Sequence, residues 1–354
     1  MTEPTAPQQT TFTSDDPGWP EDLAPQHRRY LGSRGVSPEV AAARGYLSVT
    51  SKSGGPGDGL RHYGWGKSHP LVNQISSATG DAVMVIPLYH AHGDGEPSTY
   101  QARADKARMS PPTPGRKPRP LKFEMPHKVK RGTAPGDLPA DVNPLRHHEA
   151  TSSEWPLILT EGIPKADAIL TAAIREGIEI VPVALTGVTM GYEAEHTGLD
   201  QAAVERKLAD MVTALASGRE RVYLCWDSDW ADKRQVRDSL VRTGALLAKA
   251  GVEEVIYLAL PDPEGDDPDA KTGVDDWLAG GGVLADLLAN HRMDPPEIDA
   301  AELANVEILP ETFHVNEGDL VMWDYMLKRI GDSSKPVPVA TVKLGCLAEI
   351  VEIV

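Results

Sequence analysis

Residues 157–163 read Leu-Ile-Leu-Thr-Glu-Gly-Ile, and residues 222–229 read Val-Tyr-Leu-Cys-Trp-Asp-Ser-Asp. Each stretch is an apolar run of the length of a short buried strand, and each ends in a carboxylate. The carboxyl ends of parallel strands share one edge of a sheet, where open α/β folds hold their ligands. The two stretches therefore predict that Glu161, Asp227 and Asp229 meet at one edge of a parallel sheet.

Three carboxylates in one place repel one another unless positive charge lies between them. Hard oxygen ligands favour Mg²⁺ or Mn²⁺, so we expect metal-dependent phosphate chemistry. In that chemistry Asp227 and Asp229 would hold the metal, and Glu161 would complete the metal shell or act as a general base. The structural alternatives are an Asp-rich helix cap for Asp227 and Asp229, and an acid that complements a helix dipole for Glu161.

Further candidates flank these acids. Gly162 permits close backbone approach where a helix begins, and Lys165 is placed to contact a phosphate, although it could equally be a surface lysine. Asp275 and Asp276, in a second acidic run over residues 260–278, are candidate outer metal ligands. The alternative for that pair is a cap of the short helix expected there.

Composition limits the classes of protein. The chain has 354 residues, 40% hydrophobic and 25% charged, which is typical of a soluble protein with two ordinary domains. No segment approaches the roughly 18 apolar residues of a membrane span, and the N-terminus does not have the pattern of a secretory signal. Two cysteines cannot build a disulfide framework or a four-thiolate zinc site. We expect a cytoplasmic protein with no zinc and no membrane partner.

Charge is distributed unevenly. The net charge is −17, yet residues 100–131 hold ten Lys and Arg against two acids. A basic stripe beside an acidic site suits a polyanion such as DNA, with Arg103, Arg108 and Lys122 as candidate phosphate contacts. The alternative is a solvated basic loop.

The distribution of residue types along the chain predicts four regions. We expect a disordered tail over residues 1–22, a basic α+β domain over 23–150, an α/β domain over 151–293, and over 294–354 a linker with the start of a further β-containing segment. The apolar end of that segment indicates either truncation or a strand edge that another segment covers. Repeated β-α-β units predict a mostly parallel sheet with flanking helices. The predicted strands are 83–89, 98–103, 157–160, 179–185, 221–226 and 254–260, and the predicted helices are two within 27–49 and others at 164–175, 200–216, 232–250, 274–279 and 283–291.

Residues 64–68 contain Gly-Lys-Ser, but they do not form a P-loop. The spacing of that motif requires a glycine at position 61, which is Arg61. No ATPase P-loop is therefore expected.

The order strand–Glu-Gly, strand–Thr-Gly, strand–Asp-x-Asp resembles the Toprim domain shared by bacterial primases, topoisomerases and some nucleases. The closest resemblance is to the uncharacterised Toprim-like domain of phage and plasmid primase-like replication proteins. It is carried by Glu-Gly-x-x-Lys-Ala-Asp-Ala at 161–168, Asp-Ser-Asp at 227–229 and Gly-x-Asp-Asp-x-Leu-Ala at 273–279. Upstream, residues 100–105 and 122–126 stand where primases carry an arginine-bearing hairpin and a lysine element.

This resemblance implies a Toprim-like, mostly parallel sheet preceded by a smaller basic α+β domain. It also implies primase-like nucleotidyl transfer in replication of a mobile element, with single-stranded DNA and nucleotides as partners and a helicase module in cis or in trans. Two departures are that two cysteines cannot form the zinc ribbon of such primases and that these 354 residues contain no helicase motor.

Two alternatives stay open. One is a Toprim-type DNA nuclease or nickase, and the other is a non-catalytic DNA-binding module of a larger replication protein. A haloacid-dehalogenase-type phosphatase also uses Asp-x-Asp after a strand, but Ala231 and the late position of the motif argue against it.

Overall fold

The computed structural model divides the chain into two compact units, Met1–Pro296 and Glu297–Val354. In the first unit it describes residues 11–50, 58–67, 69–77, 82–91, 95–110, 118–126, 140–185, 212–230, 233–262 and 271–296. In the second it describes the backbone of residues 313–316, 319–330 and 333–346.

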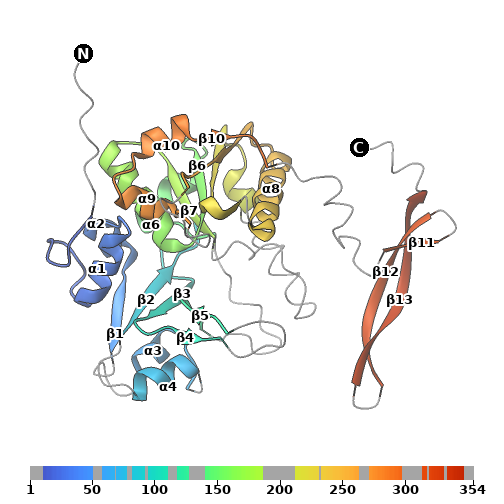
Figure 1. The fold of residues 1–354 in the computed structure, drawn as a ribbon, viewed down its shortest axis with the longest axis horizontal. Helices are drawn as coiled ribbons and strands as arrows, with labels where there is room; N and C mark the ends of the chain where they lie inside the picture. Colours follow the sequence, from blue (N-terminus) through green and yellow to red (C-terminus); the bar gives the residue numbers. More distant parts are fainter. Residues whose placement is uncertain are drawn as a thin grey trace. The chain divides into compact units, whose positions relative to one another are not determined.

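The centre of the first unit is a five-stranded sheet (Figure 1). Its strand order is β10-β9-β8-β6-β7. Four strands are parallel and β10 is antiparallel to β9, so the predicted α/β class with a mostly parallel sheet is confirmed. The strands are β6 (Leu157–Glu161), β7 (Val181–Leu185), β8 (Arg221–Cys225), β9 (Glu254–Leu258) and β10 (Arg292–Met293).

Helices cover both faces of this sheet, because alternate side chains of a strand point to opposite faces. Ile158, Tyr223 and Ile256 share a core with α6, α9 and α10. Leu157 and Leu224 share a second core with α8. The helices are α6 (Ile163–Glu176), α8 (Arg234–Lys249), α9 (Val274–Ala279) and α10 (Leu284–Asn290), and of the predicted helix 200–216 the structure describes residues 212–216.

The helix α6 has clear local signals at both ends. Gly162 precedes it at φ +91°, and Pro164 lies in its first turn, where a missing N–H costs nothing. Gly177 ends it in the left-handed conformation that glycine adopts without strain. These signals place the first turn of α6 directly beside the end of β6.

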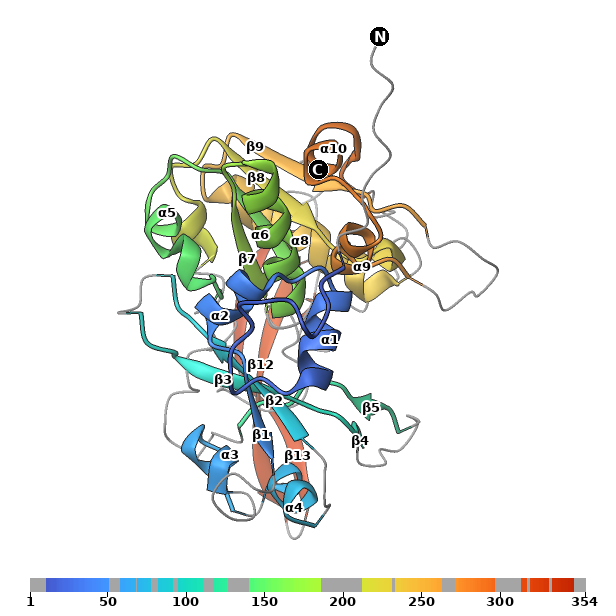
Figure 2. The ribbon, with the colours of Figure 1, turned by 90° about the vertical axis from the view of Figure 1, so that its left-hand side faces the viewer.

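The part before residue 140 forms a second, antiparallel sheet in the order β1-β2-β3 (Figure 2). The predicted hairpin corresponds to β2 and β3, whereas β1 was missed because residues 27–49 were predicted as helix only. The elements are α1 (Pro25–Ser33), α2 (Pro38–Arg44), β1 (Leu47–Thr50), α3 (Asp58–His62), α4 (Pro70–Ser77), β2 (Ala82–Leu88), β3 (Thr99–Ala104), β4 (Arg108–Met109) and β5 (Pro120–Leu121). The short helices η1 (Pro144–Arg146) and α5 (His147–Thr151) connect this part to β6.

The predicted disordered tail is wrong for residues 11–22, while residues 1–10 lie outside the described part. Trp19 is buried in the core that α6 covers, and Phe12 packs against the same core. The Trp19 indole N–H donates to the carbonyl of Thr13 at 2.8 Å. The polar composition around Phe12 and Trp19 hid two large apolar side chains that tertiary packing buries.

The predicted boundary at residue 150 does not separate two compact units. Arg44 at the end of α2 is fully buried and donates to Asp167 of α6 at 2.6 and 2.9 Å and to Asp141 at 3.0 Å. Tyr46 and Asn143 donate to the same Asp167 carboxylate at 2.8 and 2.9 Å. This buried network ties the antiparallel part to the helix that begins at the edge of the parallel sheet.

The second unit is an antiparallel sheet of three strands. They are β11 (Phe313–Asn316), β12 (Asp319–Ile330) and β13 (Ser333–Cys346). The predicted strand-like run at 347–354 lies outside the described residues. In the part of the chain that the structure describes, no helix is long and apolar enough to cross a membrane.

Candidate functional site

The carboxyl edge of the parallel sheet brings the predicted acids together. Thr160 pairs with Cys225 in neighbouring strands, so Glu161 at the end of β6 and Asp227 just beyond β8 reach the same edge. Lys165, in the first turn of α6, contacts both, at 3.0 Å from Nζ to Glu161 Oε1 and through a closer ion pair with Asp227 Oδ1.

A second lysine, Lys271, lies between all three acids. Its Nζ pairs with Asp227 Oδ2 and lies 3.6 Å from Asp229 Oδ2 and 4.0 Å from Glu161 Oε1. The backbone N–H of Ser228 donates to the carbonyl of Thr272 at 3.0 Å, and the Thr272 N–H donates to Ser228 Oγ at 2.9 Å. These reciprocal bonds hold the Lys271 segment against the Asp-Ser-Asp loop.

Asp229, Asp275 and Asp276 are also paired with other cations. Lys233 pairs with Asp229 Oδ2 at 2.6 Å, and Arg34 at the end of α1 pairs with Asp275 at 3.1 Å and with Asp276 at 2.7 Å. Asp229 Oδ1 and Asp275 Oδ1 are buried and have no hydrogen-bond partner among the described residues. Because a buried acceptor without a partner is costly, both oxygens are prepared to accept a further donor.

Burial and charge shift the pKa values of Glu161 and Asp227 in opposite directions. Burial, helped by the neighbouring Asp227, raises the pKa of Glu161 to about 7, although Lys165 opposes the shift. Burial would also raise the pKa of Asp227, but Lys165 and hydrogen bonds from its neighbours outweigh it and lower this pKa to about 2. The arrangement thus keeps Asp227 ionised and leaves Glu161 able to exchange a proton near neutral pH.

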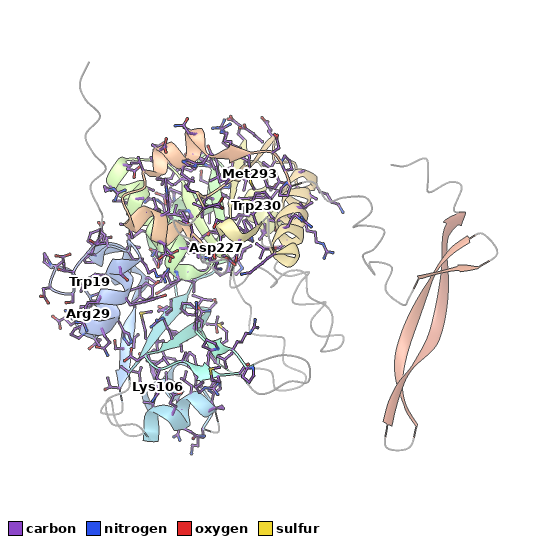
Figure 3. All side chains as sticks on the ribbon, in the orientation of Figure 1. Trp19, Arg29, Lys106, Asp227, Trp230 and Met293 are labelled. Atoms are coloured by element: carbon purple, nitrogen blue, oxygen red, sulfur yellow. The ribbon has the colours of Figure 1, made fainter. Side chains whose placement is uncertain are left out.

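These groups form one wall of a cavity of about 610 Å³ that also reaches the antiparallel part. Figure 3 shows Asp227 on the side of the parallel sheet that faces β2 and β3. The lining includes Tyr30, Arg34, Gln101, Lys122, Phe123 and Met125 opposite Glu161, Lys165, Asp227, Lys271 and Asp275. This volume lies within the range of about 300–1,000 Å³ that is typical of small-molecule sites.

The predicted phosphate contacts are placed differently from one another. Lys122 lines the cavity, whereas Arg103 stacks on the ring of Tyr30 at 3.8 Å. Arg108 is paired with Glu124, its Nε donating at 3.1 Å, so its guanidinium is already engaged. The N–H of Gly162 donates to the carbonyl of Leu185 at 2.8 Å and is therefore not directed at a ligand.

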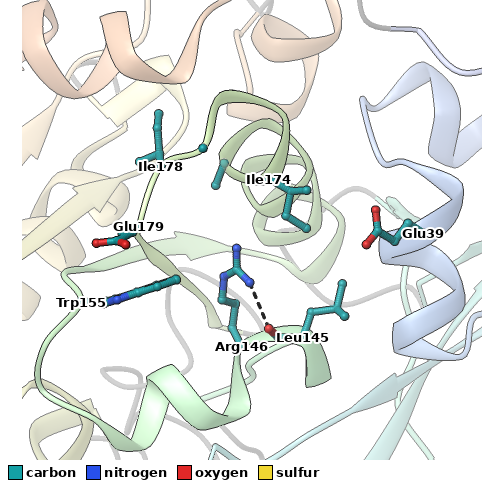
Figure 4. A pocket seen from close by; sticks show the side chains of 9 residues that line it. Glu39, Leu145, Arg146, Trp155, Ile174, Ile178 and Glu179 are labelled. Carbon is teal, nitrogen blue, oxygen red and sulfur yellow. Dashed lines mark hydrogen bonds between the residues drawn. The ribbon is translucent and has the colours of Figure 1, made fainter.

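A second cavity, of about 380 Å³, lies elsewhere (Figure 4). It is lined by Trp155 and Glu179, which precede β6 and β7, and by Arg146, whose guanidinium lies 5.1 Å from the Trp155 ring. It therefore opens at the amino ends of the strands, opposite the edge at which open α/β folds bind ligands.

Sequence reasoning missed Lys271, Arg34 and Gln101. Lys271 is the single basic residue of the acidic run 260–278, and that contrast was the available signal. Arg34 and Gln101 lie in elements remote in sequence, and no local pattern connects them to the edge of the sheet.

Three comparisons relate the chain to known proteins. Residues 149–285 match the family model described as Domain of unknown function (DUF3854). An uncharacterized protein of Picosynechococcus sp. is 26% identical over 288 residues, which cover 73% of this chain. The matched region is only 26% of that relative, so the chain spans about a quarter of its length.

Among solved structures, the chain matches the Aquifex aeolicus primase, described as its zinc-binding and RNA polymerase domains. The identity is 18% and the TM-score 0.40, over 72% of this chain and 52% of that chain.

The cofactor prediction is corrected. We expected Mg²⁺ or Mn²⁺ and excluded zinc, yet the matched solved structure is described as holding a zinc-binding domain. The cysteine count excluded only four-thiolate sites, whereas zinc also accepts His, Asp and Glu. No group of three or more His, Cys, Asp and Glu among the described residues is arranged to hold a metal ion, and lysine ammonium groups lie between the acids at Asp227. No metal is therefore assigned to this site.

Proposed function

We propose that this chain is a Toprim-like, primase-like enzyme that joins nucleotides in the replication of a mobile element. The observation that carries the proposal is the convergence of Glu161, Asp227 and Asp229 with Lys165 and Lys271 at the carboxyl edge of a parallel sheet, on one wall of a large cavity. Paired cations beside a group that titrates near neutrality suit phosphoryl transfer.

Lys165 and Lys271 would bind the phosphates of a nucleotide as charge-assisted donors, with Lys122 contributing from the opposite wall. Asp227, held ionised, keeps both ammonium groups charged and directed at the cavity. The partner would be single-stranded DNA, whose backbone the basic residues 100–131 are suited to attract.

Glu161 would act as the general base. In nucleotidyl transfer a hydroxyl oxygen bonds to the α-phosphorus, the bond to pyrophosphate breaks, and the hydroxyl proton passes to Glu161. Because this carboxyl has a pKa of about 7 and the base must be deprotonated, the rate should rise as pH increases through 7.

A primer-synthesis assay tests the proposal. The full chain is incubated with single-stranded DNA and labelled ribonucleotides, with one divalent metal salt at a time, zinc included. We expect labelled oligomers from the native chain and losses on the order of 100-fold in Glu161→Gln and Asp227→Asn, as for removal of other charge-stabilising groups. The exposed Asp286→Asn is the matched control and should retain full activity.

Other products would favour the other candidates. Shortened DNA without new oligomers would identify a nuclease or nickase at the same site. Binding of DNA with no product under any condition would leave a non-catalytic module. Full activity in Asp227→Asn would refute the assignment of the site itself.

A further inference from the structure

The wall of the cavity opposite the lysines has the chemistry of a base-binding surface. It is built from β3, the 122–125 segment and α1, because Glu124 bridges to Ala102 of β3 through two backbone hydrogen bonds of 2.8 Å. This bridge brings Phe123 and Met125 beside Gln101, and all three line the cavity. An apolar and aromatic wall facing a pair of ammonium groups suits a ligand with one flat apolar end and one anionic end.

Gln101 is the polar group of this wall. Its residue is only 9% exposed, and its side-chain amide makes no hydrogen bond within the described part of the chain. An amide at the edge of a cavity offers a donor and an acceptor side by side. Gln101 lines the cavity, so its amide is open to a ligand that supplies the matching donor and acceptor.

Two aromatic side chains, Tyr30 and Phe123, line the cavity with the amide. The Arg103 guanidinium lies 3.8 Å from the centre of the Tyr30 ring. Phe123 is partly buried against the core and presents its remaining surface to the same space. Nucleic-acid bases stack on aromatic rings and on guanidinium planes.

We infer that Gln101 reads the base of a nucleotide held in this cavity, with the base packed against Phe123 and the phosphates bound by Lys165 and Lys271. This inference rests on the proposed function and adds the residue that contacts the base. Every base offers an adjacent donor and acceptor on its pairing edge, so Gln101 accepts all four bases and distinguishes a nucleotide from a bare polyphosphate.

The test is binding of ATP, CTP, GTP, UTP and inorganic tripolyphosphate to the full chain by calorimetry. We expect each nucleotide to bind at least about tenfold more tightly than tripolyphosphate. Gln101→Ala should weaken all four nucleotides about five- to tenfold, the loss of roughly one hydrogen bond, and leave tripolyphosphate unchanged. Asn73→Ala, an exposed amide on α4, is the matched control and should change neither.

The near-isosteric Gln101→Glu gives a signature that a structural role would not produce. A carboxylate accepts from N1–H and the 2-amino group of guanine together, whereas the pairing edges of adenine, cytosine and uracil each offer one donor group beside an acceptor that repels it. The variant should therefore favour GTP over ATP, CTP and UTP by about tenfold or more.

The outcomes separate this inference from the proposed function. Equal affinity for tripolyphosphate and nucleotides, or an unaltered base preference in Gln101→Glu, would overturn the inference while leaving phosphate binding at the lysines intact. Tighter binding of nucleotides than of tripolyphosphate by a chain that makes no oligomers, lost in Gln101→Ala, would support the inference and refute the proposed reaction.

Discussion

At the scale of single residues, the site is governed by the balance between burial and two ammonium groups. Glu161 and Asp227 lie against the same Lys165, yet the pKa of Glu161 rises to about 7 while that of Asp227 falls to about 2. Lys165 and Lys271 both form close ion pairs with Asp227, whereas Lys271 Nζ lies 4.0 Å from Glu161 Oε1. Of these two neighbouring carboxyl groups, Asp227 therefore stays ionised and Glu161 titrates near neutral pH.

The raised pKa of Glu161 predicts a pH-dependent free energy of unfolding. The folded chain binds this proton more tightly than the unfolded chain, so the stabilisation is complete below pH 4.5 and is lost as pH rises to about 7. Glu161→Gln should not show this loss, and it should gain about 3 kcal/mol relative to the native chain between pH 5 and pH 8. Denaturant unfolding of both chains at four pH values in that window measures the difference. Parallel curves would show that Glu161 is not protonated in the folded state.

Lys271→Met removes the cation that contacts all three acids. Loss of positive charge beside Glu161 should raise its pKa further and shift the pH dependence of the rate to higher pH. Activity at pH 7 should fall by on the order of 100-fold. Lys249→Met, in the last turn of α8, is the matched control. A variant with native activity and an unchanged pH profile would remove Lys271 from the site.

At the scale of elements, the start of α9 determines how Asp275 and Asp276 are held. Gly273 precedes α9, and a Cβ at this position would lie 2.5 Å from Asp275 Oδ1 and 3.4 Å from Lys165 Cε. Arg34 reaches Asp275 and Asp276 from α1, so α1 and α9 are linked across the cavity. The position of Asp275 therefore depends on a glycine within its own segment and on a helix far away in sequence.

Gly273→Ala should displace Asp275 and crowd Lys165 without unfolding the chain, because its φ of −89° is accessible to alanine. We expect a loss of activity of about tenfold or more, with a change in the free energy of unfolding under roughly 1.5 kcal/mol. Gly66→Ala, where an added Cβ meets no atom within 4 Å, is the control. Paired measurements of rate and of denaturant midpoint check the prediction, which fails if the two variants behave alike.

At the scale of the whole molecule, one buried ionic network joins the antiparallel and parallel parts of the first unit. Arg44, Asp141 and Asp167 are each inaccessible to solvent, and Arg44 contacts both acids. Removing one partner from such a network leaves the others buried without compensation. The relative position of the two cavity walls depends on this junction, since Arg44 ends α2 and Asp167 lies in the helix that carries Lys165.

Arg44→Met should destabilise the chain by about 3–5 kcal/mol and weaken nucleotide binding at temperatures where the chain is still folded. The control is Arg29→Met at an exposed position of α1 (Figure 3), with an expected change under roughly 0.5 kcal/mol. Thermal and denaturant unfolding measure both. Equal stability of the two variants would show that the network does not hold the parts together.

The parallel sheet and the shared edge of Glu161, Asp227 and Asp229 followed from the sequence by itself, because short apolar runs ending in acids are local patterns and the ends of parallel strands share an edge. Only the tertiary structure decided which cations neutralise those acids and what faces them. Arg34 and Asp275 are 241 residues apart in the sequence. Gln101 lines the same cavity as Glu161 only because the antiparallel and parallel sheets pack together. Such contacts depend on how remote elements pack together, which no periodicity within one segment records.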